Sequence, residues 1–286
     1  MNLANSSLPK KENRCIFFSD LDGTLLNDKK EITPKTFAAI TKWMEEGNIL
    51  ALSSGRPLGS ILEVIENNKI GWDADAEVYS QNLYAIAFNG GLIYHMASNN
   101  KLAEDSLNAQ QITDIITIAF DEGVFCQAYD DTSILIPHDG PEIQHYRKTV
   151  HLPVKILPNF QQYACDQSCK ILCIDLQHPE KLQRVADRMK EIHGDSVTCV
   201  KSNPFLLEVF PSTAGKGNAV HALCKLLNIP ISHSYAAGDE QNDISMLEAA
   251  GCGIAMQNAG DLVKSSADVV TKTTNNEDGL LPFFLH

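Results

Sequence analysis

The chain has 286 residues, 44% of them hydrophobic, which is enough for one large domain or two ordinary domains with a sizeable core. Its 36 acidic and 23 basic residues give a formal net charge of −13, which argues against a nucleic-acid partner because such a partner requires a basic surface. No segment approaches the roughly 20 consecutive apolar residues of a membrane-spanning helix, so we expect no membrane partner. Eight cysteines without a Cys-x-x-Cys pair, and a polar start without a signal peptide, predict reduced thiols in a cytoplasmic protein.

The first part and the last third of the chain alternate predicted strands with predicted helices. After a polar tail at 1–14, which we expect to be flexible, the first part contains strands at 15–20, 49–53 and 84–88, with helices that begin at Thr33-Pro34 and at Pro57. The last third contains helices at 216–228, 241–250 and 260–266 and strands at 233–238, 252–256 and 268–271. This alternation predicts an α/β fold with a Rossmann-like, doubly wound parallel sheet, whose ligands bind at the carboxyl ends of the strands.

The middle of the chain has a different pattern. Helices at 108–122 and 179–193 accompany predicted strands at 125–129, 133–137, 170–176, 196–201 and 205–210, and the stretch from 138 to about 167 is expected to be irregular. Paired strands with few helices predict an α+β arrangement. We therefore expect a catalytic core formed by 15–94 and 201–286, with an inserted α+β cap domain at 95–200 that determines substrate specificity.

Two carboxylates stand at the end of the first predicted strand, in the run Phe18-Ser19-Asp20-Leu21-Asp22-Gly23-Thr24. On an extended strand Asp20 and Asp22 would share a face, where two anions repel each other unless a cation lies between them. Mg²⁺ is the usual solution, because it takes oxygen ligands and keeps room for a phosphate oxygen. The alternative is an exposed turn with two solvated acids, since Asp-Gly is a common hairpin sequence.

A second acidic run, Gly238-Asp239-Glu240-Gln241-Asn242-Asp243, follows the strand predicted at 233–238 and precedes a helix. Taken alone, such acids are commonly helix caps, which the helix dipole favours. Together with the first pair, however, they predict that four carboxylates converge from two strand ends on one metal ion.

Two further segments have the composition of a phosphate site. The run Ser53-Ser54-Gly55-Arg56-Pro57 supplies hydroxyls, backbone N–H groups and a guanidinium, which are groups that bind phosphate. Lys216 lies at the start of a predicted helix, although a lysine taken alone is commonly a solvated surface residue. A P-loop is excluded, because Phe210 occupies the position of its first glycine and Gly217 follows the lysine in place of Ser or Thr.

These four segments, in this order, resemble the motifs of the haloacid dehalogenase-like hydrolases, namely D-x-D-G-T, a strand ending in Ser or Thr, a lysine, and G-D-x-x-N-D. The Ser-Gly-Arg-Pro run, Ala87-Phe88-Asn89-Gly90-Gly91 and the tail Asn276-Glu277-Asp278-Gly279-Leu280 are similar to those of its Cof-type phosphatases. The resemblance covers roughly 14–286, although about 95–200 matches mainly in length and element pattern. Ser53-Ser54 departs from the Ala-Thr or Thr-Thr of many relatives, which leaves open which hydroxyl meets the phosphate; we favour Ser54.

The resemblance implies a Mg²⁺-dependent phosphatase that works through an aspartyl-phosphate. Asp20 would be the nucleophile and Asp22 the general acid and base, and Ser54 and Lys216 would also be catalytic. The metal ligands would be Asp20, Asp22 through its carbonyl, Asp239 and Asp243, the last either directly or through water. The residues expected to bind phosphate or substrate are Thr24, Gly55, Arg56 and Asn242; a purely structural role for Arg56 is an equal alternative.

The expected partner is a small phosphorylated metabolite, such as a sugar phosphate or a phosphorylated cofactor, because a large cap restricts access to the site. The cap residues considered for specificity, none of them favoured individually, are Tyr129, Asp130, His138, His145, Tyr146 and Lys170. Two other functions remain open: a phosphosugar mutase of the same superfamily, which would release no free phosphate, and a non-enzymatic metabolite-binding protein. The sequence leaves the choice between a monomer and a homodimer open.

Overall fold

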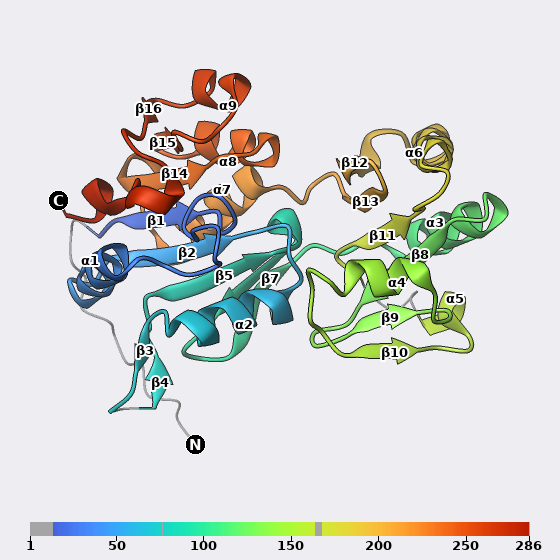
Figure 1. The fold of residues 1–286 in the computed structure, drawn as a ribbon, viewed down its shortest axis with the longest axis horizontal. Coiled ribbons are helices and arrows are strands. Elements are labelled where there is room, and N and C mark those ends of the chain that lie inside the picture. The colour runs from blue at the N-terminus through green and yellow to red at the C-terminus, as the bar shows by residue number, and fades with distance from the viewer. Residues whose placement is uncertain (1–13, 76, 164–167, 286) are drawn as a thin grey trace. The chain divides into compact units, whose positions relative to one another are not determined.

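The computed structural model describes residues 14–75, 77–163 and 168–285, so the predicted tail lies outside the described residues except for Arg14. Figure 1 shows the order of the elements along the chain. The chain forms two compact units: unit 1 consists of Met1–Ala51 and Val220–His286, and unit 2 consists of Leu52–Ala219. The inserted cap at 95–200 was inferred from the pattern of elements in the sequence, and its boundaries stay a prediction.

Unit 1 contains a sheet with the strand order β16-β15-β14-β1-β2. The strands are β1 (Ile16–Ser19), β2 (Ile49–Ser53, whose last two residues belong to unit 2), β14 (Ser234–Gly238), β15 (Cys252–Ala255) and β16 (Val269–Val270). All residues of β1 are buried, as expected for a parallel strand that is covered on both faces. Because β1 and β14 pair in parallel, with Ile16 opposite Ser234, their carboxyl ends lie side by side. This pairing brings the two acidic runs to one edge of the sheet.

Helix α1 (Pro34–Glu45) of unit 1 begins with a proline, whose fixed φ suits the first turn of a helix. It buries Trp43, whose ring lies edge-on to that of Phe17 in β1. The ring of Phe284 lies tilted against that of Phe17 with centroids 4.4 Å apart, so the 3₁₀ turn at Leu281–Phe284 is part of this core. The other helices are α7 (Lys216–Leu227, which begins in unit 2), α8 (Ile244–Ala249) and α9 (Asp261–Ser265), with 3₁₀ turns at Ile231–His233, Gln241–Asp243, Asn275–Glu277 and Leu281–Phe284.

The first half of unit 2 contains an antiparallel meander and a tight turn. Its elements are α2 (Leu58–Asn68), β3 (Trp72–Asp73), β4 (Val78–Tyr79), β5 (Leu83–Ala87), the 3₁₀ turn Phe88–Gly90, β6 (Leu92–His95) and β7 (Asn100–Glu104). In the turn, Phe88, Asn89 and Gly90 all have positive φ. A Cβ on Gly90 would lie 2.3 Å from the carbonyl oxygen of Gly215, so only glycine fits where this turn approaches the residue before Lys216.

The second half of unit 2 is built on a six-stranded sheet with the order β10-β9-β8-β11-β13-β12 (Figure 1). Its elements are α3 (Ala109–Asp121), β8 (Phe125–Tyr129), β9 (Ile134–Ile136), α4 (Pro141–Tyr146), β10 (Val154–Ile156), α5 (Phe160–Tyr163), β11 (Ile171–Ile174), α6 (Glu180–His193), the 3₁₀ turn Gly194–Ser196, β12 (Val197–Asn203) and β13 (Leu206–Pro211). Helices α3 and α6 share one core with alternate strand residues such as Cys126 and Cys173. Gln127, Leu172 and Glu208 occupy the alternate positions of β8, β11 and β13, and Leu172 is paired in register with the other two. Their side chains therefore project from the face of the sheet opposite to α3 and α6.

Three details of the predicted elements need correction. The stretch from 138 to about 167 was expected to be irregular, but its described part, 138–163, contains α4, β10 and α5, each too short to give a periodic pattern; residues 164–167 lie outside the described residues. Strands β6 and β7 were not predicted, and β7 is a largely exposed edge strand without apolar alternation. The segment 241–250 begins as a 3₁₀ turn and becomes α-helical only from Ile244. Among the described helices, none combines the length and the apolar composition that would cross a membrane.

Candidate functional site

Three carboxylates meet at the edge of the unit 1 sheet. Asp20 follows β1, Asp239 follows β14, and Asp243 ends the next 3₁₀ turn; one oxygen of each lies within 4.8 Å of the others. Asp20 is 8% exposed and Asp243 is fully buried, so water screens their mutual repulsion poorly. A hard divalent cation fits this all-oxygen set, because it prefers carboxylate ligands and offsets their repulsion. The structure therefore brings together the carboxylates of Asp20, Asp239 and Asp243, three of the residues predicted to bind the metal.

The turn after Asp20 leaves room for Asp239. Gly23 has a φ of +76°, and a Cβ there would lie 2.3 Å from Oδ2 of Asp239, so both the backbone and the space require glycine. Thr24 Oγ1 donates a hydrogen bond to Oδ1 of Asp239 at 2.7 Å, and Asn258 Nδ2 donates to the Gly23 carbonyl at 2.8 Å. The hydroxyl of Thr24, expected near phosphate, thus orients a carboxylate of the cluster.

Asp243 also shapes the backbone of the second acidic run. Its Oδ2 accepts hydrogen bonds from the N–H groups of Asp239 and Glu240, each at 3.0 Å. A Cβ on Gly238 would lie 2.3 Å from Cβ of Asp243, so this packing also requires glycine. Asn242, expected to bind phosphate, is exposed in the same turn. Asp243 is therefore both a cap of the turn, the alternative considered from the sequence, and a member of the carboxylate cluster.

Asp22 is not part of this three-carboxylate cluster. Its Oδ1 forms an ion pair with Nζ of Lys30 at 2.6 Å, and both side chains are more than a third exposed. Lys30 lies in the loop between β1 and α1, where its φ is 64°. Because the loop has no regular period, the sequence does not predict that Lys30 contacts Asp22. The expected roles of Asp22 as metal ligand and as general acid and base stay predictions.

The segment after β16 supports the loop that follows Asp20. Asn275 Nδ2 donates to the carbonyl of Leu26 at 2.9 Å, and Asn276 Oδ1 accepts from the N–H of Asp28 at 3.0 Å. Asp278 accepts hydrogen bonds from the hydroxyls of Thr33 and Thr36 at the start of α1. These contacts give a physical role to the Asn276–Leu280 tail, which the sequence had offered only as a family feature.

The predicted phosphate-binding residues Ser54, Gly55, Arg56 and Lys216 lie in unit 2. Ser54 is 4% exposed, and its Oγ accepts a hydrogen bond from the N–H of Arg56 at 3.2 Å. The Arg56 guanidinium donates to Oγ of Ser60 at 3.1 Å, so it has at least a structural contact. Ser53 Oγ is buried and has no hydrogen-bond partner among the described residues. Lys216 is 2% exposed at the first position of α7, which excludes the solvated alternative for this residue.

Lys170 is a buried cation whose surroundings sequence reasoning did not find. It is 2% exposed, and its Nζ contacts the carbonyl oxygen of Gly55 at 2.9 Å and Oε2 of Glu208 at 3.1 Å. Asn89 Nδ2 donates to the same Glu208 oxygen at 3.1 Å. The position of Lys170 just before a buried strand is the only signal in the sequence that this lysine is buried, because Gly55 and Glu208 lie far from it along the chain.

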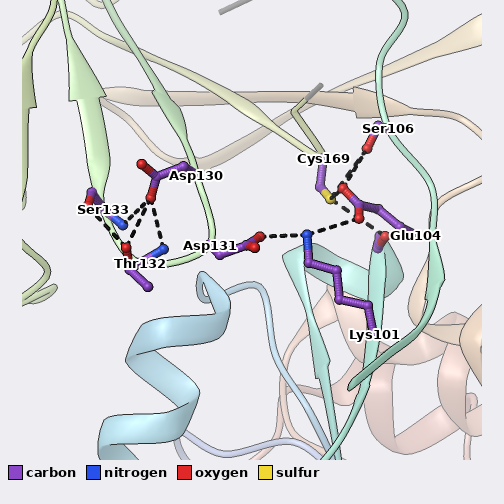
Figure 2. Close-up of polar contacts among 9 residues, drawn as sticks. Lys101, Glu104, Ser106, Asp130, Asp131, Thr132, Ser133 and Cys169 are labelled. Atoms are coloured by element: carbon purple, nitrogen blue, oxygen red, sulfur yellow. Dashed lines mark hydrogen bonds and ion pairs between the residues drawn. The ribbon is translucent and has the colours of Figure 1, made fainter. Parts of the chain in front are cut away.

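Unit 2 also contains a cavity of about 310 Å³, with Phe88, Leu92 and Tyr129 in its apolar lining. In its polar lining, Lys101 lies between Glu104 and Asp131, with Nζ–O distances of 3.1 and 2.5 Å (Figure 2). The remaining lining residues are Asp130, Thr132, Ser168 and Cys169. Burial alone lowers the pKa of Lys101, but the two carboxylates raise it above its ordinary value. Burial raises the pKa of the Cys169 thiol to about 12, so this sulfur is not a ready nucleophile.

Comparison with known proteins gives consistent matches over nearly the whole chain. The sequence model of the haloacid dehalogenase-like hydrolases matches residues 17–284. The putative phosphatase YxeH of Bacillus subtilis is 32% identical over 273 residues, covering 91% of this chain and 93% of the relative. The 5-amino-6-(5-phospho-D-ribitylamino)uracil phosphatase YwtE of Bacillus subtilis is 27% identical over 298 residues, covering 94% and 96%.

Solved structures match the fold over the same range. The crystal structure of TM0651 from Thermotoga maritima has a TM-score of 0.82 at 30% identity, covering 95% of this chain and 96% of that chain. A haloacid dehalogenase-like hydrolase from Bacteroides thetaiotaomicron also has a TM-score of 0.82, at 26% identity, covering 95% and 98%. These likenesses confirm the predicted α/β fold class.

Proposed function

The chain belongs to the haloacid dehalogenase-like hydrolases, as its sequence predicts, and from this premise we propose that it is a Mg²⁺-dependent phosphatase of small phosphorylated metabolites. The observation that carries the proposal is the buried cluster of Asp20, Asp239 and Asp243 at the carboxyl edge of a parallel sheet. Such a cluster is unfavourable in the absence of a cation, and Thr24, Gly23 and Gly238 shape the chain around it. The relatives named as phosphatases support the same reaction class.

Asp20, Asp239 and Asp243 would hold the ion, and Asp22 would add a further ligand. Bound Mg²⁺ would neutralise charge on the phosphoryl oxygens, so that an anionic nucleophile can approach phosphorus. Asp20 would attack in line and form an aspartyl-phosphate, as the bond to the leaving oxygen breaks. Its backbone carbonyl and N–H are already fixed, by the Ser19 hydroxyl at 2.8 Å and by the Ala237 carbonyl at 3.0 Å, which favours a defined direction of attack.

Asp22 would protonate the leaving oxygen. As a carboxylate, it would then take a proton from the water that attacks phosphorus, while the bond from phosphorus to Asp20 breaks and inorganic phosphate leaves. Ser54 and Lys216 would donate to the phosphoryl oxygens, with Gly55, Arg56 and Asn242 as further contacts. The burial of Ser54 and Lys216 suits this role, because donors shielded from water stabilise developing charge more strongly.

The substrate class is a small polar molecule that carries one phosphate ester, such as a sugar phosphate or a phosphorylated cofactor. The name of the relative YwtE, which specifies a phosphoribitylamino-uracil, supports a polyhydroxylated leaving group. The size and polar lining of the unit 2 cavity are also compatible with a small polar molecule.

The test is a phosphate-release screen of the purified protein over phosphorylated metabolites, with p-nitrophenyl phosphate as a generic substrate. We expect turnover with Mg²⁺ and none after chelation. Asp20→Asn should lower turnover by more than about a thousandfold, whereas Asp195→Asn, which changes an exposed aspartate in the turn after α6, should not. Undiminished release in excess EDTA would contradict the metal requirement. Isomerisation of a sugar phosphate without free phosphate would instead indicate a mutase.

A further inference from the structure

The buried Lys170 is bound to the backbone between two predicted phosphate-binding residues. Its ammonium has three N–H donors: one meets the carbonyl of Gly55 at 2.9 Å and another meets Glu208 at 3.1 Å. The nitrogen also lies 6.0 Å from the ring centre of Phe88 and 5.7 Å from that of Tyr129, within range of cation–π attraction. A charge with 2% exposure is costly unless it is paired in this way.

Glu208 and Asn89 complete a closed network around the Ser54-Gly55-Arg56 loop. Asn89 donates through Nδ2 to Glu208 and through its backbone N–H to the carbonyl of Ser54, at 3.1 and 3.0 Å. A Cβ on Gly55 would lie 2.9 Å from Oδ1 of Asn89, so the loop passes close to this side chain. The network therefore fixes two carbonyls of the loop, those of Ser54 and Gly55.

The carbonyl of Gly55 and the N–H of Arg56 belong to one peptide group. Lys170 binds the oxygen of this peptide, and the Arg56 N–H of the same peptide donates to Oγ of Ser54 at 3.2 Å. A cation on the oxygen of an amide polarises the group and makes its N–H a stronger donor. A stronger bond received at Oγ in turn makes the Ser54 O–H a better donor to a phosphoryl oxygen.

We propose that Lys170 is a positioning residue that acts through the Gly55–Arg56 peptide on the hydroxyl of Ser54, and that Glu208 and Asn89 hold it there. The charge of Lys170 and its hydrogen bond to Gly55 both matter, the charge because it polarises the peptide. This inference rests on the proposed function only in that Ser54 contacts the phosphoryl group; the contacts around Lys170 stand by themselves.

The test separates the charge from the hydrogen bond with two substitutions. Lys170→Gln keeps an N–H donor but removes the charge, and Lys170→Met removes both. We expect Lys170→Gln to lower kcat on p-nitrophenyl phosphate by about tenfold and Lys170→Met to lower it further, because the charge and the hydrogen bond both reach the substrate through one peptide and one hydroxyl. The matched control is Lys155→Gln, which removes a lysine paired with Asp130 at the surface and should leave kcat unchanged.

A second measurement does not depend on turnover. In ¹⁵N-labelled protein, the amide proton resonance of Arg56 should move upfield in Lys170→Gln, because its hydrogen bond to Ser54 weakens, and should stay in place in Lys155→Gln. If Lys170→Met leaves Glu208 unpaired and fails to fold, the double substitution Lys170→Met with Glu208→Gln removes both charges and is measured in its place.

The outcomes distinguish this inference from the proposed function. Wild-type kcat in Lys170→Gln, with a loss only in Lys170→Met, would show a purely structural tether and overturn the role of the charge. An unmoved Arg56 resonance in Lys170→Gln would overturn the polarised peptide, whether or not the protein hydrolyses phosphate esters. Absence of turnover in the wild type would refute the proposed function, while the Arg56 resonance would still decide this inference.

Discussion

Replacement of Gly23 by alanine should disable the carboxylate cluster through a single added methyl group. Gly23 has a φ of +76°, a left-handed conformation that costs an L-residue roughly 1–2 kcal/mol. The new Cβ would also lie 2.3 Å from Oδ2 of Asp239, and ordinary van der Waals contact requires the carboxylate to retreat by roughly 1 Å. Misplacement of a positioning group by about 1 Å can lower catalysis by about 100-fold. We therefore expect Gly23→Ala to lose about 100-fold in turnover and roughly 2–4 °C in melting temperature per kcal/mol of strain.

Two matched glycines separate the strain from the collision. Gly194 has a φ of +55° with nothing within 4 Å of an added Cβ, so Gly194→Ala should lose stability but keep turnover. Gly260 has a negative φ and the same open space, so Gly260→Ala should change neither. The assays are Mg²⁺-dependent release of p-nitrophenol and thermal unfolding of the same preparations. Gly23→Ala with wild-type turnover, or a loss of turnover equal to that of Gly194→Ala, would refute the argument that the methyl group displaces Asp239.

Three further predictions follow from the same contacts. Saturating Mg²⁺ should raise the melting temperature of the wild type but not of Asp239→Asn, since an ion that binds only the folded state stabilises it by mass action; equal shifts in both proteins would place the ion elsewhere. Phe284→Ala should lower the free energy of unfolding by about 3–5 kcal/mol in denaturant titrations, because Phe284 is 3% exposed and packs against Phe17 and Trp43. The neighbouring Phe283 is partly exposed, so Phe283→Ala should lower this free energy less. Burial raises the pKa of the thiols of Cys169 and Cys173 to about 12, so both thiols stay protonated at pH 8. They should therefore react with Ellman's reagent only after unfolding, when all eight cysteines of the chain become reactive. Rapid reaction of either thiol in the native protein would contradict their burial.

The sequence alone determined the family, the enzyme class and the α/β core, all of which the comparisons confirm. These predictions succeed because they depend on local patterns. Buried strands of parallel sheets are continuous apolar runs, and the residues that follow them stand at a sheet edge whatever the rest of the chain does. Asp20 and Asp239 could therefore be predicted to meet, although more than 200 residues separate them in the sequence.

Only the tertiary structure assigned partners to the side chains around these motifs. Thr24 donates to Asp239, Lys30 pairs with Asp22, and the Asn276–Leu280 tail supports the loop after β1; none of these contacts leaves a periodic or compositional signal. Lys170 illustrates the physical reason. A lysine before a strand is ordinary in sequence. It becomes a buried cation only because Gly55 and Glu208, from two distant segments, accept its hydrogen bonds, and Asn89, from a third, donates to Glu208. Local spacing decides which face a residue occupies, whereas long-range packing decides which charges lose water and must find partners.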